Sequence, residues 1–469
     1  MKVMIVGAGK LGLKLAESLL NTNVDVTLVD TNARVIERIN DHLDVLTVTA
    51  NGIELEVLRE LNIETYDLLT ACTGSDETNV LICSLAKKLG CRRTIARIRN
   101  PEYTKQLSFI KAEMGIDHIV NPDLATANEM SRYLSRSYNL HSEDFAKGRV
   151  SMIDFNVSQV EGFVGKQLKD LSGLDNLLIV AVSREGEMLI PHGLTQLQEN
   201  DIVHVMGESK RVNQLSERLG LTNGKKRVKK VMIFGGGKVG LYLAQQLRLA
   251  NVGVTIVEQD RERCEYLAER LDDALIIHGD GTDINLLEEE DLQLMDAFVG
   301  ASGFDEQNLL MCLLAKQSGV DKVIAKISRP NYVQVIDKLG VDVALNPTNI
   351  TASDILRFIR GGRVVSVSLL LGGEAEVTEI IVGDNPSIIG KPLAELGLPK
   401  GIIIGAIVHN GQVIIPNGAT VIHALDRLII FCLTRDVGAL DVFMKPSRRG
   451  GVLHELRNRN KSVGGSFKA

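Results

Sequence analysis

Short apolar runs alternate with helical patterns along the first quarter of the chain. Apolar residues at helical spacing, such as Leu11, Leu15 and Leu19, predict helices between the runs. The runs themselves predict six strands: Lys2–Val6, Asp25–Val29, Val45–Val48, Asp67–Cys72, Thr94–Ile98 and His118–Val120. Strands joined by crossover helices indicate a parallel, doubly wound α/β sheet of the Rossmann-like kind. A further helical pattern runs from Pro122 to about Tyr138.

From about Val150 the pattern changes to short strands, which predict a small α+β module. Its predicted elements are the strands Met152–Val157, Leu177–Val182, Glu187–Pro191 and Asp201–Val205 and the helices Lys166–Leu171 and Arg211–Leu219. The same order then recurs, since Met4–Gly12 returns as Met232–Gly240 and Asp67–Asn79 returns as Asp296–Asn308. A repeat of this length indicates a duplicated set of domains rather than a solenoid.

The repeat predicts two tandem Rossmann-like sheets, each followed by a small α+β module. The predicted ranges are 1–140 and 141–224 for the first pair, 228–350 and 360–445 for the second, and 446–469 for a basic tail. The join at 222–227 is polar and basic, as a linker should be. The tail is typical of a solvated, flexible segment, and contact with an anionic membrane surface is the alternative.

A glycine-rich turn links the first predicted strand to the first helix. Gly7, Gly9 and Gly12 form the pattern G-x-G-x-x-G. The first glycine permits a tight turn, the second lets a pyrophosphate approach the backbone, and the third lets helix and strand pack closely. Free N–H groups at the helix start attract phosphates. The predicted ligand contacts are Gly7, Ala8, Gly9, Lys10, Leu11 and Gly12.

An acidic residue, Asp30, ends the second predicted strand. A carboxylate at this place accepts both hydroxyls of an adenosine ribose and repels a 2′-phosphate. The pattern therefore indicates NAD or an adenine nucleotide rather than NADP.

Composition narrows the class of protein. The chain has 469 residues and a net charge of −6, without a basic stripe or helix-turn-helix, so we expect neither a nucleic-acid binder nor a DNA-binding redox regulator. None of the six cysteines forms a C-x-x-C, which favours reduced core thiols in a cytosolic protein. The chain opens into a strand, and no apolar run approaches the roughly 20 residues of a spanning helix, so we expect no signal peptide or membrane span.

Several of these features together resemble the TrkA family, the regulatory subunits of bacterial Trk potassium uptake systems. They are the glycine loop with Asp30, the segment Thr73–Asn79, the run Ala96–Arg99 and the tandem second copy, in which each half resembles an RCK module (regulator of potassium conductance). The resemblance implies a non-enzymatic, cytoplasmic protein that binds NAD(H) and also ATP or ADP. It further implies a homotetramer, with eight RCK units in a ring, peripheral on the inner face of the membrane beneath a potassium channel subunit of the TrkH or TrkG type.

Other candidate contacts lie where further strands end, which is where open α/β sheets bind ligands. By the resemblance, Asn51 and Gly52 face the adenine or ribose, and Thr73 offers backbone N–H groups near the phosphates. Arg97 is the predicted phosphate partner. Arg99 is less favoured, because alternation along a strand sends it to the side of Arg97 only if the strand bends. Ordinary loop chemistry is the alternative at these positions.

The second copy keeps the loop but alters its surroundings. Its predicted contacts are Gly235, Gly236, Gly237, Lys238, Val239, Gly240, Glu258, Asp280, Gly281 and Ser302. Lys326 stands where the first copy has Arg97, and lysine lacks the planar fork for bidentate phosphate contact. We expect weaker binding here, and a duplicate that keeps only the fold is the alternative.

An NAD-dependent oxidoreductase is the alternative function, but it needs an acid or base beside the nicotinamide. The nine histidines are scattered, and His278, near the second predicted site, is expected to be a solvated loop residue. In the small modules, Arg184 and His192 become His409 and Asn417. Related RCK proteins bind regulatory ligands such as cyclic dinucleotides in this module, and hairpin turns at a dimer interface are the favoured alternative.

The helical patterns after Pro122 and Pro347 each carry an apolar stripe. The stripe residues are Leu124, Ala127, Met130 and Leu134 in the first pattern and Ile350, Ile355, Phe358 and Ile359 in the second. We expect each stripe to be exposed on its own unit and buried by a neighbouring one, as in RCK proteins. Packing within one chain is the alternative.

Overall fold

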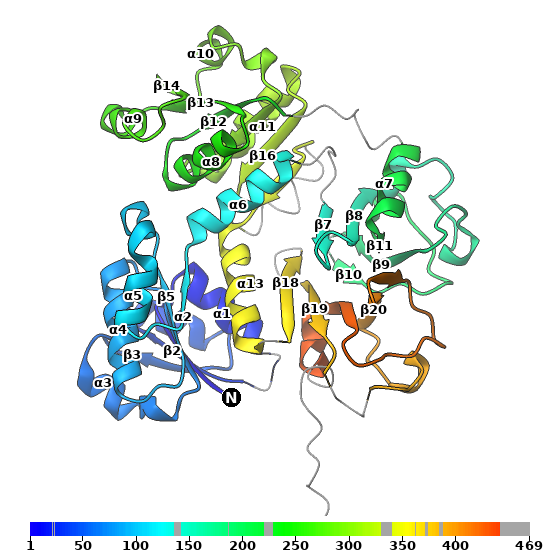
Figure 1. The fold of residues 1–469 in the computed structure, drawn as a ribbon, viewed down its shortest axis with the longest axis horizontal. Coiled ribbons are helices and arrows are strands. Elements are labelled where there is room, and N and C mark those ends of the chain that lie inside the picture. The colour runs from blue at the N-terminus through cyan, green and yellow to red at the C-terminus, as the bar shows by residue number, and fades with distance from the viewer. Residues whose placement is uncertain are drawn as a thin grey trace, which may run out of the picture.

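The computed structural model of the chain describes residues 1–20, 22, 24–135, 142–185, 187–219, 228–329, 340–361, 363–370, 374–383 and 388–440. The predicted linker at 222–227, the predicted tail at 446–469 and the predicted helix end at Tyr138 lie outside these residues. The described parts form two six-stranded sheets and two five-stranded sheets. In Figure 1 each six-stranded sheet forms a lobe of its own, and the two five-stranded sheets lie together in a third.

The first six-stranded sheet is parallel throughout, in the order β3-β2-β1-β4-β5-β6. Its strands are β1 (Lys2–Val6), β2 (Asp25–Asp30), β3 (Leu46–Thr49), β4 (Leu68–Ala71), β5 (Thr94–Arg97) and β6 (His118–Val120). The predicted doubly wound parallel sheet is therefore confirmed. The reversal of strand order falls between β1 and β4, and in such sheets the ligand crevice opens at this point.

Helices connect these strands, and polar side chains cap the second and the fourth of them at their N-termini. The helices are α1 (Lys10–Leu20), α2 (Ala33–Asn40), α3 (Leu55–Glu60), α4 (Asp76–Lys88) and α5 (Leu107–Glu113), with 3₁₀ turns η1 (Ile63–Thr65) and η2 (Pro101–Gln106). The side chain of Ser75 caps α4, which has two acidic residues in its first turn and two lysines in its last. These charges oppose the helix dipole and stabilise the helix at both ends.

The second six-stranded sheet repeats the first, in the order β14-β13-β12-β15-β16-β17. Its strands are β12 (Lys230–Phe234), β13 (Gly253–Glu258), β14 (Ala274–His278), β15 (Ala297–Gly300), β16 (Lys322–Lys326) and β17 (Val343–Leu345). Its described helices are α8 (Lys238–Leu249), α9 (Arg261–Ala268), α10 (Ile284–Glu289) and α11 (Asp305–Gln317), with the turn η5 (Leu292–Leu294). The duplication seen in the sequence is thus a duplication of the fold.

Each small module is an antiparallel sheet, in the orders β10-β9-β11-β8-β7 and β18-β19-β22-β20-β21. The first holds β7 (Ser142–Phe145), β8 (Val150–Asn156), β9 (Leu177–Arg184), β10 (Glu187–Leu189), β11 (Ile202–Glu208) and α7 (Ser209–Arg218). The second holds β18 (Val364–Leu370), β19 (Ala375–Ile381), β20 (Ile402–His409), β21 (Gln412–Ile414) and β22 (Arg427–Leu433). Short 3₁₀ turns complete both modules: η3 (Val157–Gln159), η4 (Leu168–Asp170), η8 (Leu393–Glu395) and η9 (Thr434–Leu440).

Two details of the small modules differ from the prediction. The edge strand β7 was not predicted, because the sequence Ser-Glu-Asp-Phe does not alternate apolar with polar residues; pairing with β8 places it in the sheet. The predicted helix Lys166–Leu171 was wrong, since only a 3₁₀ turn forms at Leu168–Asp170, between two segments that pair through an isolated bridge at Gln167 and Gln196.

The two small modules share one apolar core. Val180 and Met206 of the first module belong to the same buried cluster as Ala406 and Phe431 of the second. The approach is close, because a Cβ added at Gly405 would lie 2.4 Å from the sulfur of Met206. The predicted dimer-type interface of these modules therefore forms inside a single chain, as Figure 1 shows for β20 beside β9 and β11.

Two long helices cross between the halves of the chain. Helix α6 (Pro122–Ser135), from the first half, packs on α8 of the second sheet, and α13 (Pro347–Arg360), from the second half, packs on α1 of the first (Figure 1). The stripe residues Met130 and Ile355 are fully buried in these contacts. The expectation that each stripe is covered by a neighbouring unit holds only in part, since that unit is the other half of the same chain.

Polar contacts fix where each crossing helix sits. The ring of His118, on β6, stacks on Phe358 of α13 at 5.0 Å, and its Nε2 lies 3.0 Å from a carboxylate oxygen of Asp354. On the other side, the side-chain amide of Asn121, just before α6, donates to the hydroxyl of Tyr242 on α8 over 3.1 Å. The crossing helices therefore join the halves by both apolar and directional contacts.

Replacing Ile355 by alanine tests this exchange. The side chain is fully buried in the core that contains α1, so Ile355→Ala should lower the free energy of unfolding by about 2–5 kcal/mol. The measurement is urea unfolding followed by circular dichroism. Leu249→Ala is the control, because Leu249 is 87% exposed at the end of α8 and its loss should change stability by less than about 0.5 kcal/mol. Equal unfolding midpoints for the two variants would contradict the packing described.

Candidate functional site

The first glycine loop lies at the switch point between β1 and β4. Gly7 has a φ of +107°, a left-handed conformation that side chains disfavour. A Cβ at Gly7 would also lie 2.9 Å from the backbone of Cys72 and Thr73, so the loop rests directly against the end of β4. The predicted tight turn at this glycine is what the structure shows.

The other two glycines face opposite situations. A Cβ at Gly12 would lie 1.9 Å from the carbonyl oxygen of Gly7, so only glycine allows α1 to start this close to the turn. At Gly9 a Cβ would meet no atom within 4 Å. The backbone at Gly9 therefore borders open space, where a phosphate can approach it.

The start of α1 presents unused amide groups to this space. The first N–H of the helix to find a carbonyl is that of Leu13, which donates to Gly9 over 2.9 Å. Within the described residues, the N–H groups of Gly9, Lys10 and Leu11 make no hydrogen bond. Free amides at the positive end of a helix dipole are a ready anion site.

Asp30 has a structural task as well as the predicted one. One carboxylate oxygen accepts the N–H of Ala8 over 2.7 Å, and the other accepts the N–H of Asn32 over 2.9 Å. The amide of Ala8 is therefore directed at Asp30 rather than at a ligand. Each carboxylate oxygen retains a lone pair, so Asp30 can hold the loop and still accept ribose hydroxyls.

Thr73 is placed beside the loop, but its amide is not free. Its N–H and its hydroxyl both donate to Oδ1 of Asn79, at 2.8 Å each, so in this structure the amide of Thr73 is bonded within the protein. Asn79 is fully buried and also donates to the carbonyl of Arg97 over 2.9 Å. It ties the ends of β4 and β5 together. The site prediction omitted Asn79, although it lies in the repeated segment Thr73–Asn79.

Arg97 lies half-buried beside the loop. It donates to the carbonyl of Thr73, and burial lowers the pKa of its guanidinium, an effect that nearby Cys72 partly opposes. Its Nε is buried without a partner among the described residues. Arg99 points elsewhere, with a bidentate pair to Asp123 at 2.7 and 3.1 Å. Of the two arginines, Arg99 is thus held in an ion pair, whereas Arg97 lies beside the end of β4.

Asn51 and Gly52 follow β3 and play unequal parts. The side chain of Asn51 is exposed and accepts the N–H of Ile53 over 3.3 Å, which shapes the turn into α3. Gly52 is buried, and a Cβ there would lie 2.5 Å from Cγ1 of Val6. Gly52 is therefore required for packing, while Asn51 remains accessible at the rim.

The second glycine loop reproduces this geometry. Gly235 has a φ of +104°, a Cβ at Gly240 would lie 2.3 Å from the carbonyl of Gly235, and Gly237 borders open space. Glu258 accepts the N–H of Gly236 over 2.7 Å and that of Asp260 over 3.0 Å. Within the described residues the amides of Gly237, Lys238 and Val239 make no hydrogen bond. The second loop thus offers the same anion site.

The surroundings of the second loop differ from those of the first. The ammonium of Lys326 lies 3.2 Å from the carbonyl of Ala301, and burial lowers its pKa. Asp280 is exposed near the rim of the second loop. The hydrogen bond from the backbone N–H of Thr282 lowers its pKa, so the carboxylate is ionised. Gly281 packs against Phe234, since an added Cβ would lie 2.4 Å from Cδ2 of that ring. The backbone N–H of Ser302 donates to Oδ1 of Asn308 over 2.8 Å.

Arg263 is a residue of the second site that the sequence analysis did not identify. Its Nε donates to the carbonyl of Gly236 over 2.7 Å, and its guanidinium lies 4.4 Å from the ring centre of Tyr266. Its Nη2 is buried without a partner among the described residues. The first copy has Val35 at the matching position. The difference between the repeats, an arginine in place of a valine, is the sequence feature that could have identified this residue. The second loop thus has a cation beside it that the first loop lacks at this position.

The predicted thiols and the predicted loop histidine occupy ordinary places. All six cysteines are buried and free, and burial raises the pKa of Cys72 to about 12. His278 is exposed at the end of β14, with Nε2 at 3.2 Å from the carbonyl of Gln259. Neither group shows the acid–base pairing that a dehydrogenase needs.

Comparison with known proteins assigns both halves to the same pair of domains. The profile of the TrkA-N domain matches residues 3–122 and 231–347, and that of the TrkA-C domain matches 155–220 and 377–445. Trk system potassium uptake protein TrkA homolog 1 of Methanosarcina mazei is 35% identical over 453 residues, which cover 95% of this chain and 100% of that protein. The TrkA protein of Azorhizobium caulinodans is 33% identical over 458 residues, covering 95% and 99%.

A solved structure has the same fold. The GsuK channel bound to NAD superposes with a TM-score of 0.54, at 18% identity, and the match covers 94% of this chain and 78% of that one. At this identity the likeness concerns the fold alone.

Two glycine substitutions should separate packing from site chemistry. Gly12→Ala places a methyl group 1.9 Å from a backbone oxygen, so it should lower the free energy of unfolding by about 1–3 kcal/mol or more. Gly9→Ala meets open space and should keep the wild-type stability within about 0.5 kcal/mol. Thermal unfolding measures both. A stable Gly12→Ala protein, or an unstable Gly9→Ala protein, would show that the loop has a different geometry.

Proposed function

The chain belongs to the TrkA family of Trk potassium uptake proteins, and from that premise we propose that it is a nucleotide-sensing regulatory subunit that gates a membrane potassium channel. The observation that carries the proposal is the pair of glycine loops, each with an open second glycine and free helix amides. We also propose that the chain divides into the domains predicted from the repeat, with Rossmann-like units at 1–140 and 228–350 and small modules at 141–224 and 360–445.

The proposed ligands are NAD(H) and adenine nucleotides. In the first site the amides of Gly9, Lys10 and Leu11 bind the phosphates, Arg97 adds a cation, and Asp30 accepts the ribose hydroxyls. Asn51 lies at the rim beside the adenine. The GsuK channel bound to NAD, which has this fold, supports the choice of ligand class.

The second site uses the matching groups with altered charges. The amides of Gly237, Lys238 and Val239 and the cations Arg263 and Lys326 face the phosphates and adenine, and Glu258 accepts the ribose hydroxyls. Asp280 repels phosphate, and Lys326 makes no bidentate contact. We therefore propose that the first site binds nucleotide more tightly than the second.

Contacts between the two Rossmann-like units offer a route for coupling. Helix α9 carries Arg263 at the second loop and, one turn further, Tyr266, whose hydroxyl donates to Glu102 of the first unit over 2.8 Å. Arg270 pairs with the same carboxylate at 3.1 Å and lies 3.6 Å from the centre of the Tyr266 ring. A nucleotide that moves α9 therefore acts on η2 of the first unit. Coupling between two sites is typically about 1–3 kcal/mol.

The proposed partner is a membrane potassium channel subunit of the TrkH or TrkG type. The names of the relatives, potassium uptake proteins of the Trk system, support it and do not describe oxidoreductases. Among the described residues no helix has the length and apolar character to cross a lipid bilayer. We propose that a homotetramer forms a ring of eight RCK units in the cytoplasm and reaches the membrane through the channel, so that nucleotide-driven changes in the ring open or close it.

Nucleotide titration tests the binding sites. Purified protein should bind NADH, NAD, ATP or ADP in calorimetry, and Gly9→Ala should weaken the tighter phase by roughly tenfold or more, about 1.4 kcal/mol, because a methyl group enters the phosphate path. Gly237→Ala should affect only the weaker phase. Gly193→Ala is the matched control, since its Cβ would meet only an ordinary contact at 3.6 Å in the small module. Wild-type affinity in the double glycine-loop variant would sink the assignment of both sites.

Assembly and partner can be tested without nucleotide. Light scattering of the purified chain should give a tetramer, and membranes should retain the protein only when they contain the channel subunit. In vesicles that hold both proteins, potassium flux should change when nucleotide is added, and the double glycine-loop variant should remove that change. A monomer at micromolar concentration, or equal retention by membranes without the channel, would count against the ring.

A further inference from the structure

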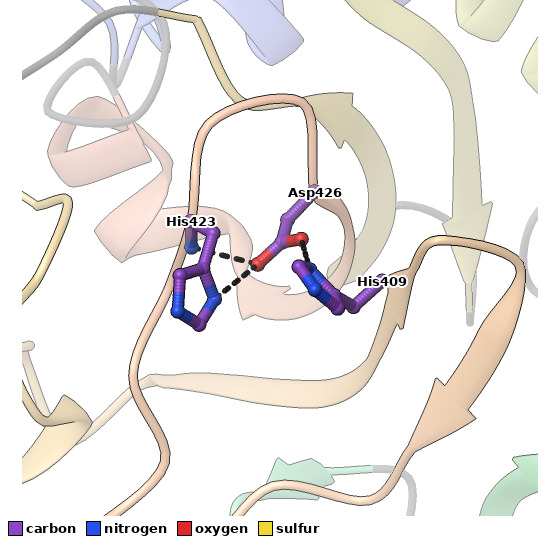
Figure 2. A group of neighbouring side chains, drawn as sticks. All are labelled: His409, His423 and Asp426. Atoms are coloured by element: carbon purple, nitrogen blue, oxygen red, sulfur yellow. Dashed lines mark hydrogen bonds and ion pairs between the residues drawn. The ribbon is translucent and has the colours of Figure 1, made fainter.

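Two histidines and an aspartate converge in the second small module. His409 ends β20, and His423 and Asp426 lie in the turn that leads into β22; Figure 2 shows both rings directed at the carboxylate. One potential ligand atom from each residue lies within 4.8 Å of the other two. The cluster lies outside the nucleotide sites and plays no part in the proposed function.

The carboxylate of this cluster is held in place. Asp426 is buried, and one of its oxygens lies 2.6 Å from Nδ1 of His409. The other oxygen accepts the backbone N–H of His423 over 2.7 Å and lies 3.6 Å from Nδ1 of that residue. The side chains of His409 and His423 are 37% and 57% exposed, so both imidazoles border solvent while the carboxylate between them is buried.

The first small module shows what the same position looks like with a permanent cation. Asp201, which matches Asp426, is buried and forms a bidentate pair with Arg184 at 2.8 and 2.7 Å. The N–H of Gln198 donates to Asp201 over 2.8 Å, as that of His423 does to Asp426. Arg184 and Gln198 thus correspond to His409 and His423. The fold is the same, and the guanidinium has been replaced by two imidazoles.

This replacement leaves a charge to be balanced. A buried carboxylate requires a cation or several hydrogen bonds. Among the described residues, the ion-pair partners of Asp426 are His409 and His423 alone, and neither carries the permanent charge of an arginine. A divalent ion between the three side chains would supply that charge.

We infer that His409, His423 and Asp426 bind a divalent transition-metal ion of the Zn²⁺ type. Two imidazoles and a carboxylate are a ligand set that suits Zn²⁺ and related ions, whereas Mg²⁺ and Ca²⁺ prefer oxygen ligands. Three protein ligands leave the remaining coordination position to water on the exposed side. Arg184 excludes such an ion from the first module, because its guanidinium occupies the carboxylate.

A neighbouring side chain can support the ligand. The side-chain nitrogen of Asn410 lies 3.0 Å from Nε2 of His409. When Nδ1 of His409 binds the ion, the proton resides on Nε2, and the amide oxygen of Asn410 accepts it once the amide group has rotated. Such outer hydrogen bonds orient metal-bound histidines.

The site lies next to the contact between the two small modules. The carbonyl of Gly411, two residues beyond His409, accepts a hydrogen bond from Arg149 of the first module over 3.4 Å. An ion would tie the β20–β21 turn to the turn before β22. Metal binding therefore stabilises one side of the module pair at its interface, in a place that the first module holds with an ion pair.

Zinc titration of the full-length protein tests the inference. The protein is first treated with a chelator and exchanged into metal-free buffer. Calorimetry with ZnCl₂ should then show that one zinc ion binds per chain, and this binding should require His409, His423 and Asp426. The double variant His409→Asn/His423→Asn should weaken this binding by more than about 100-fold, since losing outer-shell partners alone costs 10–100-fold. His192→Asn is the control, because it removes an exposed histidine at the position where the second module already has Asn417. Circular dichroism verifies that each variant is folded.

A gain-of-site variant guards against misfolding of the loss variant. Arg184→His with Gln198→His should give the first module the same three side chains and add a second zinc ion per chain. The inference is overturned if the wild-type chain binds no zinc, if binding survives in His409→Asn/His423→Asn, if His192→Asn weakens it equally, or if the gain-of-site variant binds no additional ion.

Discussion

The exchange of α6 and α13 is the packing interaction on which the rest of the structure depends. In each Rossmann-like unit the first helix packs against a helix from the other half of the chain, and each small module follows directly from one of these crossing helices. Full burial of Met130 and Ile355 shows that these contacts are core rather than surface. Since apolar burial is the main stabilising term in folding, neither half has a complete core alone.

This arrangement gives the glycine loops a mechanical setting. Each loop is built on a rigid strand end, and Asp30 and Glu258 hold their loops by hydrogen bonds from within the same unit. The units are in turn joined through α6, α13 and the contact of α9 with Glu102. A ligand that binds at a loop therefore acts on a frame that spans the whole chain, as a regulatory subunit requires.

The sequence was sufficient for the parts of the fold set by local pattern. Apolar runs and helical spacing predicted both parallel sheets, because buried strands and amphipathic helices leave a clear period. The same period shows that α6 and α13 have an apolar face, yet it cannot show which surface covers that face. Strand β7 lacked alternation and depends on pairing with β8. In the first site the amide of Thr73 donates to Asn79, and in the second site Arg263 donates to the glycine loop. Both hydrogen bonds depend on side-chain conformations that spacing along the chain does not specify.

Covalent fusion of the two units has a consequence for what each can become. In a symmetric homodimer every substitution is made twice, so the two faces of the interface must remain identical. Here one chain supplies both partners, and a change in one is made once. The two halves therefore behave as an obligate heterodimer with a fixed ratio of one to one. Because they are covalently linked, dilution does not change the effective concentration at which they meet. Arg184 in the first half corresponds to His409 in the second, and Val35 corresponds to Arg263. Only a pair of units encoded in one chain can carry such differences between equivalent positions.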